Sequence, residues 1–281
     1  MFELLWLFFI FAWITPVLQN WMIQQSRAAM LRRLHLERGS RVITLIHRQE
    51  SRSLLGLFTR RHIDIEDSER VLRAIRNTPP DTPIDLILHT PGGLVLAAEQ
   101  IARALRRHPA RTAVFIPHYA MSGGTMIALA ADELWMDENA VAGPVDPQVG
   151  GYPAASILQV LETKNRDRID DRTLILADVA RKAIRQVEET MFELLQGKYP
   201  DEKARELAKA LTSGRWTHDY PLTYQQLRDM GIQVRCGLPE AVYRLMELYP
   251  QPPDYRPSVT YSPVPARGEK DRPSRWFDSF R

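Results

Sequence analysis

Two short glycine-containing segments hold residue types that could carry out acyl transfer. They read His89-Thr-Pro-Gly-Gly93 and Ala120-Met-Ser-Gly-Gly124. Acyl transfer needs a nucleophile and hydrogen-bond donors within reach of one carbonyl group. Ser122 would supply the hydroxyl nucleophile, while paired glycines let the backbone approach a ligand and aim N–H groups at it. Either segment alone also fits a Pro-Gly turn or a serine helix cap, so the hypothesis depends on their combination.

The two segments are expected at one edge of a parallel sheet. Short, mostly apolar runs predict strands at 41–47, 84–89, 112–117 and 133–136. Apolar residues at helical spacing predict helices at 64–77, 94–107 and 122–131. Alternating strands and helices are typical of an α/β fold built from βαβ units, in which functional sites collect at the carboxyl ends of the strands. We therefore expect both glycine pairs to lie near Ser122.

The second half of the chain is expected to be helical. A long amphipathic segment spans 173–196, and shorter helices are predicted at 201–212, 223–230 and 239–248. From residue 251 onward the chain is rich in proline and loses its apolar periodicity, which is typical of disorder. The sequence therefore predicts one domain over 41–250 and a disordered tail over 251–281.

The first 40 residues predict a membrane anchor followed by a basic linker. Residues 4–23 are mostly apolar and match the length of helix that crosses a bilayer, about 20 residues. The start lacks the basic residues and the cleavage site of a signal peptide. We predict a transmembrane helix at 1–25 and a juxtamembrane linker at 26–40, with an amphipathic or buried helix as the alternative. Because arginines follow the apolar run, the positive-inside rule predicts a single-pass protein of the inner membrane whose domain faces the cytoplasm.

Charge and cysteine content argue against several kinds of partner. The net charge of +3 comes from residues 1–41, which hold five arginines and two glutamates. Since the chain holds 37 basic and 34 acidic residues, 32 of each remain outside this segment. No basic face is expected for the domain, so we predict no nucleic-acid partner. The single cysteine, Cys236, excludes an internal disulfide and a multi-cysteine metal site, and we predict neither a metal nor a cofactor.

The glycine segments and their surroundings resemble a known family. Four motifs follow one another in the order Thr90-Pro-Gly-Gly93, Ala120-Met-Ser-Gly-Gly-Thr125, Ala130-Ala-Asp-Glu133 and Gly143-Pro-Val-Asp-Pro-Gln148. This order, over residues 40–245, resembles the Clp-fold serine proteases. In particular it resembles the serine dehydrogenase proteinase family, which is related to signal peptide peptidase A and the membrane-bound stomatin-operon proteases.

The resemblance implies a Clp/crotonase-type fold, a peptide or protein substrate and a homo-oligomer. It also implies that Ser122 is the nucleophile. The oxyanion hole would then be formed by Gly92 or Gly93 together with the N–H group of Gly123.

The general base is less clear than the nucleophile. Soluble Clp proteases place a histidine shortly after the serine, whereas this chain has no histidine between His118 and His218. We interpret His118 as structural. The anchored relatives use a Ser–Lys dyad, and a desolvated lysine can lose its proton where arginine practically cannot. Lys182, at the border of the apolar stripe of the long helix, is the predicted base, and Lys164 is the alternative.

The favoured hypothesis is a membrane-anchored serine endopeptidase, and two other functions stay open. A crotonase-type acyl-CoA hydratase, isomerase or hydrolase would share the fold and the oxyanion hole, but it would not need a serine nucleophile. An inactive membrane scaffold of the same fold is the non-enzymatic alternative. The retained Ser122 and the glycine pairs count against the scaffold.

Overall fold

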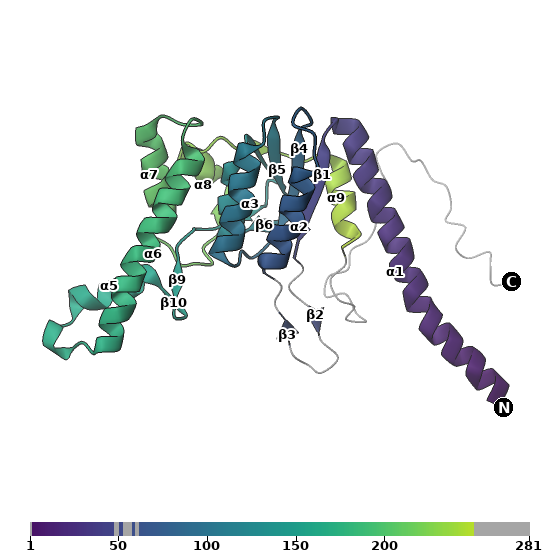
Figure 1. Cartoon of the computed structure of the whole chain (residues 1–281), viewed down its shortest axis with the longest axis horizontal. Coiled ribbons are helices and arrows are strands. Elements are labelled where there is room, and N and C mark those ends of the chain that lie inside the picture. The colour runs from purple at the N-terminus through teal and green to yellow at the C-terminus, as the bar shows by residue number, and fades with distance from the viewer. Residues whose placement is uncertain (1, 48–50, 53–57, 60–61, 250–281) are drawn as a thin grey trace, which may run out of the picture. The chain divides into compact units, whose positions relative to one another are not determined.

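Strands and helices alternate along the first half of the chain (Figure 1). The computed structural model describes residues 2–47, 51–52, 58–59 and 62–249, and for residues 2–13, 16, 51–52, 58–59 and 166 it describes the backbone alone. The central sheet has the strand order β1-β4-β5-β7-β12, and every neighbouring pair is parallel. Its strands are β1 Arg41–Ile46, β4 Ile84–His89, β5 Thr112–Ile116, β7 Glu133–Met136 and β12 Arg235–Cys236. The predicted α/β fold with a parallel sheet is therefore confirmed.

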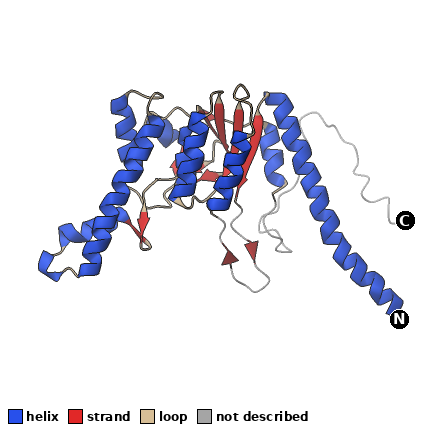
Figure 2. Cartoon of the chain, in the orientation of Figure 1, coloured by secondary structure: helices blue, strands red, loops and turns tan. Residues whose placement is uncertain are grey.

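Helices cover both faces of the central sheet (Figure 2). The larger layer consists of α2 Ile65–Arg76, α3 Val95–Arg107, α4 Gly123–Ala130, α6 Asp171–Leu195 and α7 Asp201–Thr212. The other face is covered by α1 Phe2–Arg38 and α9 Glu240–Glu247. Successive residues of a strand point to opposite faces. Leu86 and Leu88 accordingly pack with the larger layer, while Ile87 packs against Leu34 of α1 and Leu245 of α9. Burial on both faces explains why β4 reads as an apolar run.

A second, three-stranded sheet lies at the carboxyl end of the central one. It has the order β11-β8-β6, with β6 Tyr119–Ala120, β8 Val141–Ala142 and β11 Leu222–Thr223. The β6–β8 pair is parallel and the β8–β11 pair is antiparallel. This sheet joins three parts of the chain that are far apart in sequence: the segment after β6, the segment after β8 and the segment before β11.

The remaining elements are short or lie on a helical extension. A hairpin of β9 Gln148–Val149 and β10 Tyr152–Pro153 leads into α5 Ala154–Thr163, which packs on the first half of α6. A single 3₁₀ turn at Arg166–Arg168 connects the two helices. The short helix α8 Tyr224–Asp229 follows β11. Near the start of the chain, β2 Ser51–Arg52 pairs with β3 Phe58–Thr59 in an antiparallel hairpin. The sequence pattern predicted α6, α7, α8 and α9 but not α5.

Helix α1 continues through the segment that the sequence assigns to a linker. Leu34 is buried against the sheet, and Arg27 Nε donates to the carbonyl oxygen of Leu248 at 2.8 Å. The buried carboxylate of Asp85 on β4 accepts hydrogen bonds from Arg38, from Ser40 Oγ at 2.6 Å and from Arg111 at 3.2 Å. Residues 26–38 are therefore helical and pack on the domain.

The predicted membrane anchor falls largely on side chains outside the described residues. Within the part of the chain that the structure describes, no helix combines the length and the apolar character needed to cross a membrane. The side chains of residues 1–13 and 16 belong to the undescribed part, as does the predicted disordered tail at 251–281.

Candidate active site

The two glycine segments lie against each other, as the sequence predicts. An isolated bridge pairs Thr90 with Ala120, and the N–H of Met121 donates to the carbonyl oxygen of Thr90 at 3.0 Å. A Cβ atom added to Gly92 would lie 2.8 Å from Ser122 Cβ. Gly92, just after the end of β4, therefore packs directly against the serine.

Ser122 has a strained backbone conformation. Its dihedral angles are φ 52° and ψ −117°, and it is the single non-glycine residue with positive φ among the described residues. Such a conformation costs about 1–3 kcal/mol and persists where the surrounding structure enforces it, commonly at functional sites. Ser122 occupies the N-cap position of α4, but its hydroxyl makes no capping hydrogen bond. The hydroxyl is thus available for chemistry at the positive end of the helix dipole.

The Gly92–Gly93 turn presents one N–H group toward Ser122. The carbonyl oxygen of Gly92 accepts from the N–H of Ile63 at 2.8 Å, and the N–H of Gly92 donates to Thr90 Oγ1 at 3.2 Å. Because N–H and C=O point in opposite directions across a trans peptide, the N–H of Gly93 points away from Ile63. The Gly93 nitrogen lies 3.8 Å from the position of a Cβ on Gly123. Gly93 and Gly123 line the same cavity as Ser122.

Close packing explains why position 93 is glycine. A Cβ there would lie 2.2 Å from the carbonyl oxygen of Ile63, which no side chain could tolerate without moving the backbone. Gly92 is restricted in another way, because its φ of 97° is strained for any residue with a side chain.

A cavity of about 300 Å³ opens beside Ser122. Its apolar lining residues are Met126 on α4, Val187 on α6 and Val145 in the segment after β8. Its polar lining residues are Ser122, Asp146, Gln148 and His218. The small sheet explains this convergence: Ser122 follows β6, Asp146 follows β8 and His218 precedes β11. Thr125 Oγ1 of α4 also bonds the backbone of Gly143, which holds the segment before Asp146 against the serine helix.

Asp146 and His218 form a hydrogen-bonded pair in this cavity. His218 Nδ1 lies 2.8 Å from Asp146 Oδ1, and Gln148 Nε2 donates to Asp146 Oδ2 at 2.8 Å. The Asp146 side chain is 2% exposed and that of His218 is 36% exposed. The hydrogen bond that Asp146 accepts from His218 raises the pKa of His218, and partial burial opposes this only in part. The carboxylate of Asp146 thus fixes one ring nitrogen of His218, a residue that lines the cavity.

The structure does not bring the predicted lysine bases to this cavity. Lys182 Nζ donates to Asp178 at 2.6 Å, and the Lys182 side chain is 60% exposed. The apolar residues beside it on the predicted stripe, Ile175 and Val179, are themselves exposed, so the position of Lys182 at the border of this stripe does not bury its side chain. Lys164 is exposed at the end of α5. Neither lysine is among the residues that line the cavity.

Lys198 is a partly buried lysine that bonds the end of a helix. Burial lowers its pKa to about 8, and its Nζ donates to the carbonyl oxygens of Leu129, at 2.7 Å, and Ala131. These carbonyls lie at the carboxyl end of α4, roughly 12 Å along the helix from Ser122. Lys198 therefore caps the helix that carries the serine and is too distant to be its base.

Two residues of the cavity escaped the sequence analysis. Asp146 lies within Gly143–Gln148, a motif that identified the family without suggesting a role for the aspartate. His218 lies 72 residues further along the chain, and no local pattern links the two. His118, interpreted as structural, is exposed, and its ring centroid lies 5.7 Å from that of the buried His89.

One family and several relatives match this chain. Residues 1–275 match the model of the ClpP-like SDH-type serine proteinases. Two uncharacterized proteins of Methanocaldococcus jannaschii, MJ0137 and MJ1495, are each 57% identical to it. The first match covers 94% of this chain and 92% of the relative, and the second covers 92% and 89%. ClpP1 from Listeria monocytogenes matches with a TM-score of 0.46 and 15% identity, over 72% of this chain and 94% of that chain. From the family match and the two relatives, the chain belongs to the ClpP-like SDH-type serine proteinase family.

Proposed function

We propose that this chain is a serine endopeptidase in which Ser122, His218 and Asp146 form the catalytic triad. The observation that carries the proposal is that one cavity is lined by all three side chains. The strained backbone of Ser122 and the adjacent N–H groups of Gly93 and Gly123 supply the other parts that acyl transfer needs. Membership of a serine proteinase family is consistent with this chemistry.

In the proposed reaction, Ser122 Oγ attacks the carbonyl carbon of the scissile peptide bond while His218 Nε2 takes the serine proton. Asp146 accepts the hydrogen bond from Nδ1–H and stabilises the imidazolium that forms. The N–H groups of Gly93 and Gly123 bind the developing oxyanion. His218 then gives the proton to the leaving amine, which leaves an acyl ester on Ser122. A water molecule deprotonated by His218 hydrolyses this ester.

His218 is a better candidate for the base than either lysine. A base must lie within hydrogen-bond reach of the proton that it takes, directly or through one water. His218 lines the cavity beside Ser122, whereas Lys182 is exposed and ion-paired with Asp178. The Ser–Lys dyad with Lys182, or with Lys164, is kept as the alternative.

Covalent labelling tests the proposal against its competitors. A fluorophosphonate reacts with an activated serine, so the wild-type chain should carry the label on Ser122 and hydrolyse peptides. A crotonase-type acyl-CoA enzyme or an inactive scaffold needs no activated serine. Folded wild-type protein that takes up no label would rule out the triad.

Peptide hydrolysis should be lost at acidic pH, with a midpoint above the usual histidine value of about 6.5. Asp146 raises the pKa of His218, and only the neutral imidazole can accept the serine proton. We therefore expect kcat/KM to rise with pH through this raised pKa and then to level off. The measurement is kcat/KM for an uncharged peptide between about pH 5 and 9, with thermal unfolding at each pH as the control. A profile already flat below the usual histidine pKa would contradict this role.

A membrane anchor at residues 1–25 is the second part of the proposal. In the portion of α1 whose side chains are described, Ile14, Val17, Leu18, Trp21 and Met22 are exposed apolar residues. Contact with lipid would remove this surface from water. We expect the 281-residue chain to sediment with membranes, and a variant lacking residues 1–25 to be released.

The orientation follows from the arginines after the apolar run. A protease added outside intact spheroplasts should leave the domain uncut, and it should cut the domain after lysis. Recovery of the whole chain in the soluble fraction would contradict the anchor, and digestion from outside would contradict the inner-membrane, cytoplasm-facing topology.

Assembly into a homo-oligomer, which the sequence resemblance implies, belongs to the same proposal. Apolar residues are exposed at Ile175 and Val179 on α6 and at Leu94–Leu96 at the start of α3. Contiguous exposed apolar surface is commonly covered by a partner.

A further inference from the structure

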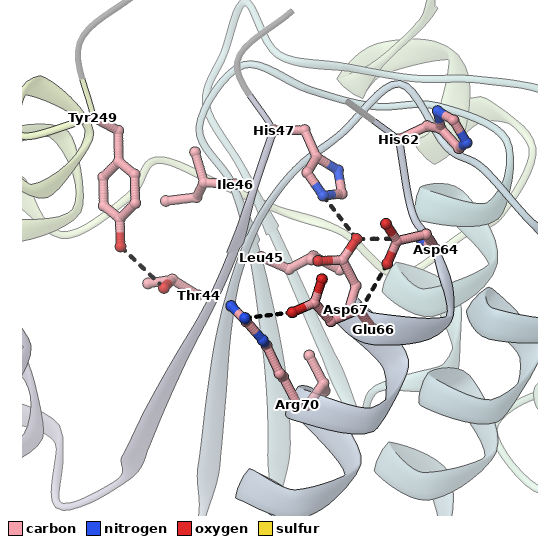
Figure 3. A pocket seen from close by; sticks show the side chains of 11 residues that line it. Thr44, Leu45, Ile46, His47, His62, Asp64, Glu66, Asp67, Arg70 and Tyr249 are labelled. Carbon is pink, nitrogen blue, oxygen red and sulfur yellow. Dashed lines mark hydrogen bonds and ion pairs between the residues drawn. The ribbon is translucent and has the colours of Figure 1, made fainter. Parts of the chain in front are cut away.

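A hydrogen-bonded series of three side chains, Asp67, His47 and Thr90, reaches the Gly92–Gly93 turn from the side away from the cavity beside Ser122. Asp67 Oδ2 lies 3.0 Å from His47 Nε2, and His47 Nδ1 lies 2.9 Å from Thr90 Oγ1. Thr90 Oγ1 accepts the N–H of Gly92 at 3.2 Å. Figure 3 shows His47, at the end of β1, pointing toward Asp67 on the first turn of α2. These two side chains line a separate cavity of about 540 Å³.

The hydrogen-bonding roles along this chain are mutually consistent. A carboxylate can only accept, so Nε2 of His47 donates to Asp67. In the neutral ring Nδ1 then accepts from the Thr90 hydroxyl at 2.9 Å, the shorter of its two acceptor contacts, the other being the Gly92 carbonyl oxygen at 3.4 Å. The Thr90 oxygen in turn accepts from the Gly92 N–H. His47 is 5% exposed and Thr90 is fully buried, so water offers these groups little substitute. Losing one partner would leave a buried polar group without its hydrogen bond.

The two peptide units that flank Gly92 are held from different directions. Thr90 Oγ1 holds the N–H of Gly92, and the N–H of Ile63 holds its carbonyl oxygen at 2.8 Å. The second of these peptide units carries the N–H of Gly93, whose direction depends on both dihedral angles of Gly92. Glycine is the residue with the widest choice of these angles. The Thr90 contact therefore restricts a turn that has no side chain of its own to restrict it.

We infer that Thr90, His47 and Asp67 are positioning residues that aim the N–H of Gly93 at the oxyanion. This inference rests on the proposed peptidase function. The three residues lie behind the turn and act through Gly92, so they do not touch the substrate. Small displacements of a group that stabilises the transition state can cost about 100-fold in rate, whereas substrate binding in the cavity depends on other residues.

A pair of variants at position 90 isolates the hydroxyl. Thr90→Ala and Thr90→Ser both remove the methyl group, and only the second keeps Oγ1. We expect Thr90→Ala to have a kcat about 10- to 100-fold below that of Thr90→Ser, with an unchanged KM. Ki for a peptide aldehyde, whose adduct with Ser122 places an oxyanion in the same hole, should rise by the same factor. If Thr90 had only a structural role, Thr90→Ala would have a lower melting temperature than Thr90→Ser, and kcat and the aldehyde Ki would not change by the same factor.

A second pair of variants, at position 47, tests the same hydrogen-bonded series of side chains without changing Thr90. The amide of His47→Asn can take the place of Nδ1 toward Thr90, whereas His47→Leu cannot. His47→Leu should therefore lower kcat in the same direction as Thr90→Ala but by a smaller factor, because Thr90 Oγ1 can still accept from the N–H of Gly92, and His47→Asn should recover most of the rate. Glu66→Gln is the control, since Glu66 lines the same cavity but is paired with Arg70.

The outcomes separate this inference from the proposed function. If the wild type neither takes up the label nor hydrolyses peptides, the proposed function fails. If the wild type is active and both pairs show equal kcat within each pair, only the positioning role is overturned. If the position 90 variants do not fold, the position 47 pair decides.

Discussion

Ser122→Ala should lower kcat for peptide hydrolysis by about a million-fold and abolish fluorophosphonate labelling. The nucleophile and its base act as one unit, so removing the hydroxyl removes nearly all of the catalysis that the pair provides. The residual rate would come from the oxyanion hole and from substrate binding. Initial rates on an unstructured peptide, together with intact-protein mass spectrometry after labelling, measure both effects.

Stability should change little in this variant. The Ser122 hydroxyl makes no capping hydrogen bond to α4, so its loss should alter the free energy of unfolding by no more than about 0.5 kcal/mol. Ser213→Ala, at the exposed end of α7, is the matched serine control and should keep full activity. Turnover by folded Ser122→Ala protein at more than a small fraction of the wild-type rate would end the serine-peptidase proposal.

His218→Ala should be nearly as damaging as loss of the serine, again by about a million-fold in kcat. Without the imidazole, the serine hydroxyl keeps its proton, and the leaving amine has no proton donor. Lys182→Ala and Lys182→Arg should retain activity close to that of the wild type, because Lys182 is exposed and paired with Asp178. Single-turnover rates for the three variants, compared on the same acyl substrate, give the measurement.

Two further variants complete this comparison. His118→Ala controls for the loss of an exposed histidine ring and should be active. Lys164→Ala tests the remaining lysine. An active His218→Ala enzyme alongside an inactive but folded Lys182→Ala or Lys164→Ala enzyme would return the base to that lysine.

The parallel sheet and the glycine turns were predictable because their signals are local. The strands predicted at 84–89 and 133–136 coincide with β4 and β7. Every residue of β4 is buried, and a strand buried on both faces reads as a short apolar run. The contact between Gly92 and Ser122 follows from the rule that neighbouring parallel strands end at the same edge.

The proposed base was not predictable from the same kind of signal. The His218–Asp146 bond joins residues 72 positions apart, and it depends on how β8 and β11 pair. These strands have two residues each, too few to show a period. The apolar stripe of α6 suggested a border position for Lys182, but Ile175 and Val179 on that stripe are exposed.

The predicted linker at residues 26–40 shows a related difficulty in reading structure from sequence. Arginines after an apolar run favoured a linker, yet Arg27 and Arg38 make hydrogen bonds that attach α1 to Leu248 and Asp85. Charge at residues 26–38 is therefore used in packing, which composition alone does not reveal.

The order of Ser122, Asp146 and His218 along the chain has a consequence for biosynthesis. Ser122 leaves the ribosome first, Asp146 follows, and His218 emerges only after α6 and α7 have been synthesised. Domains form from the amino terminus onward as the chain grows. If Ser122 and His218 act as proposed, a nascent chain that ends before His218 would hold the nucleophile without its base and would be inert toward neighbouring nascent proteins. Proteolytic competence would thereby be delayed until the segment leading into β11 has been synthesised.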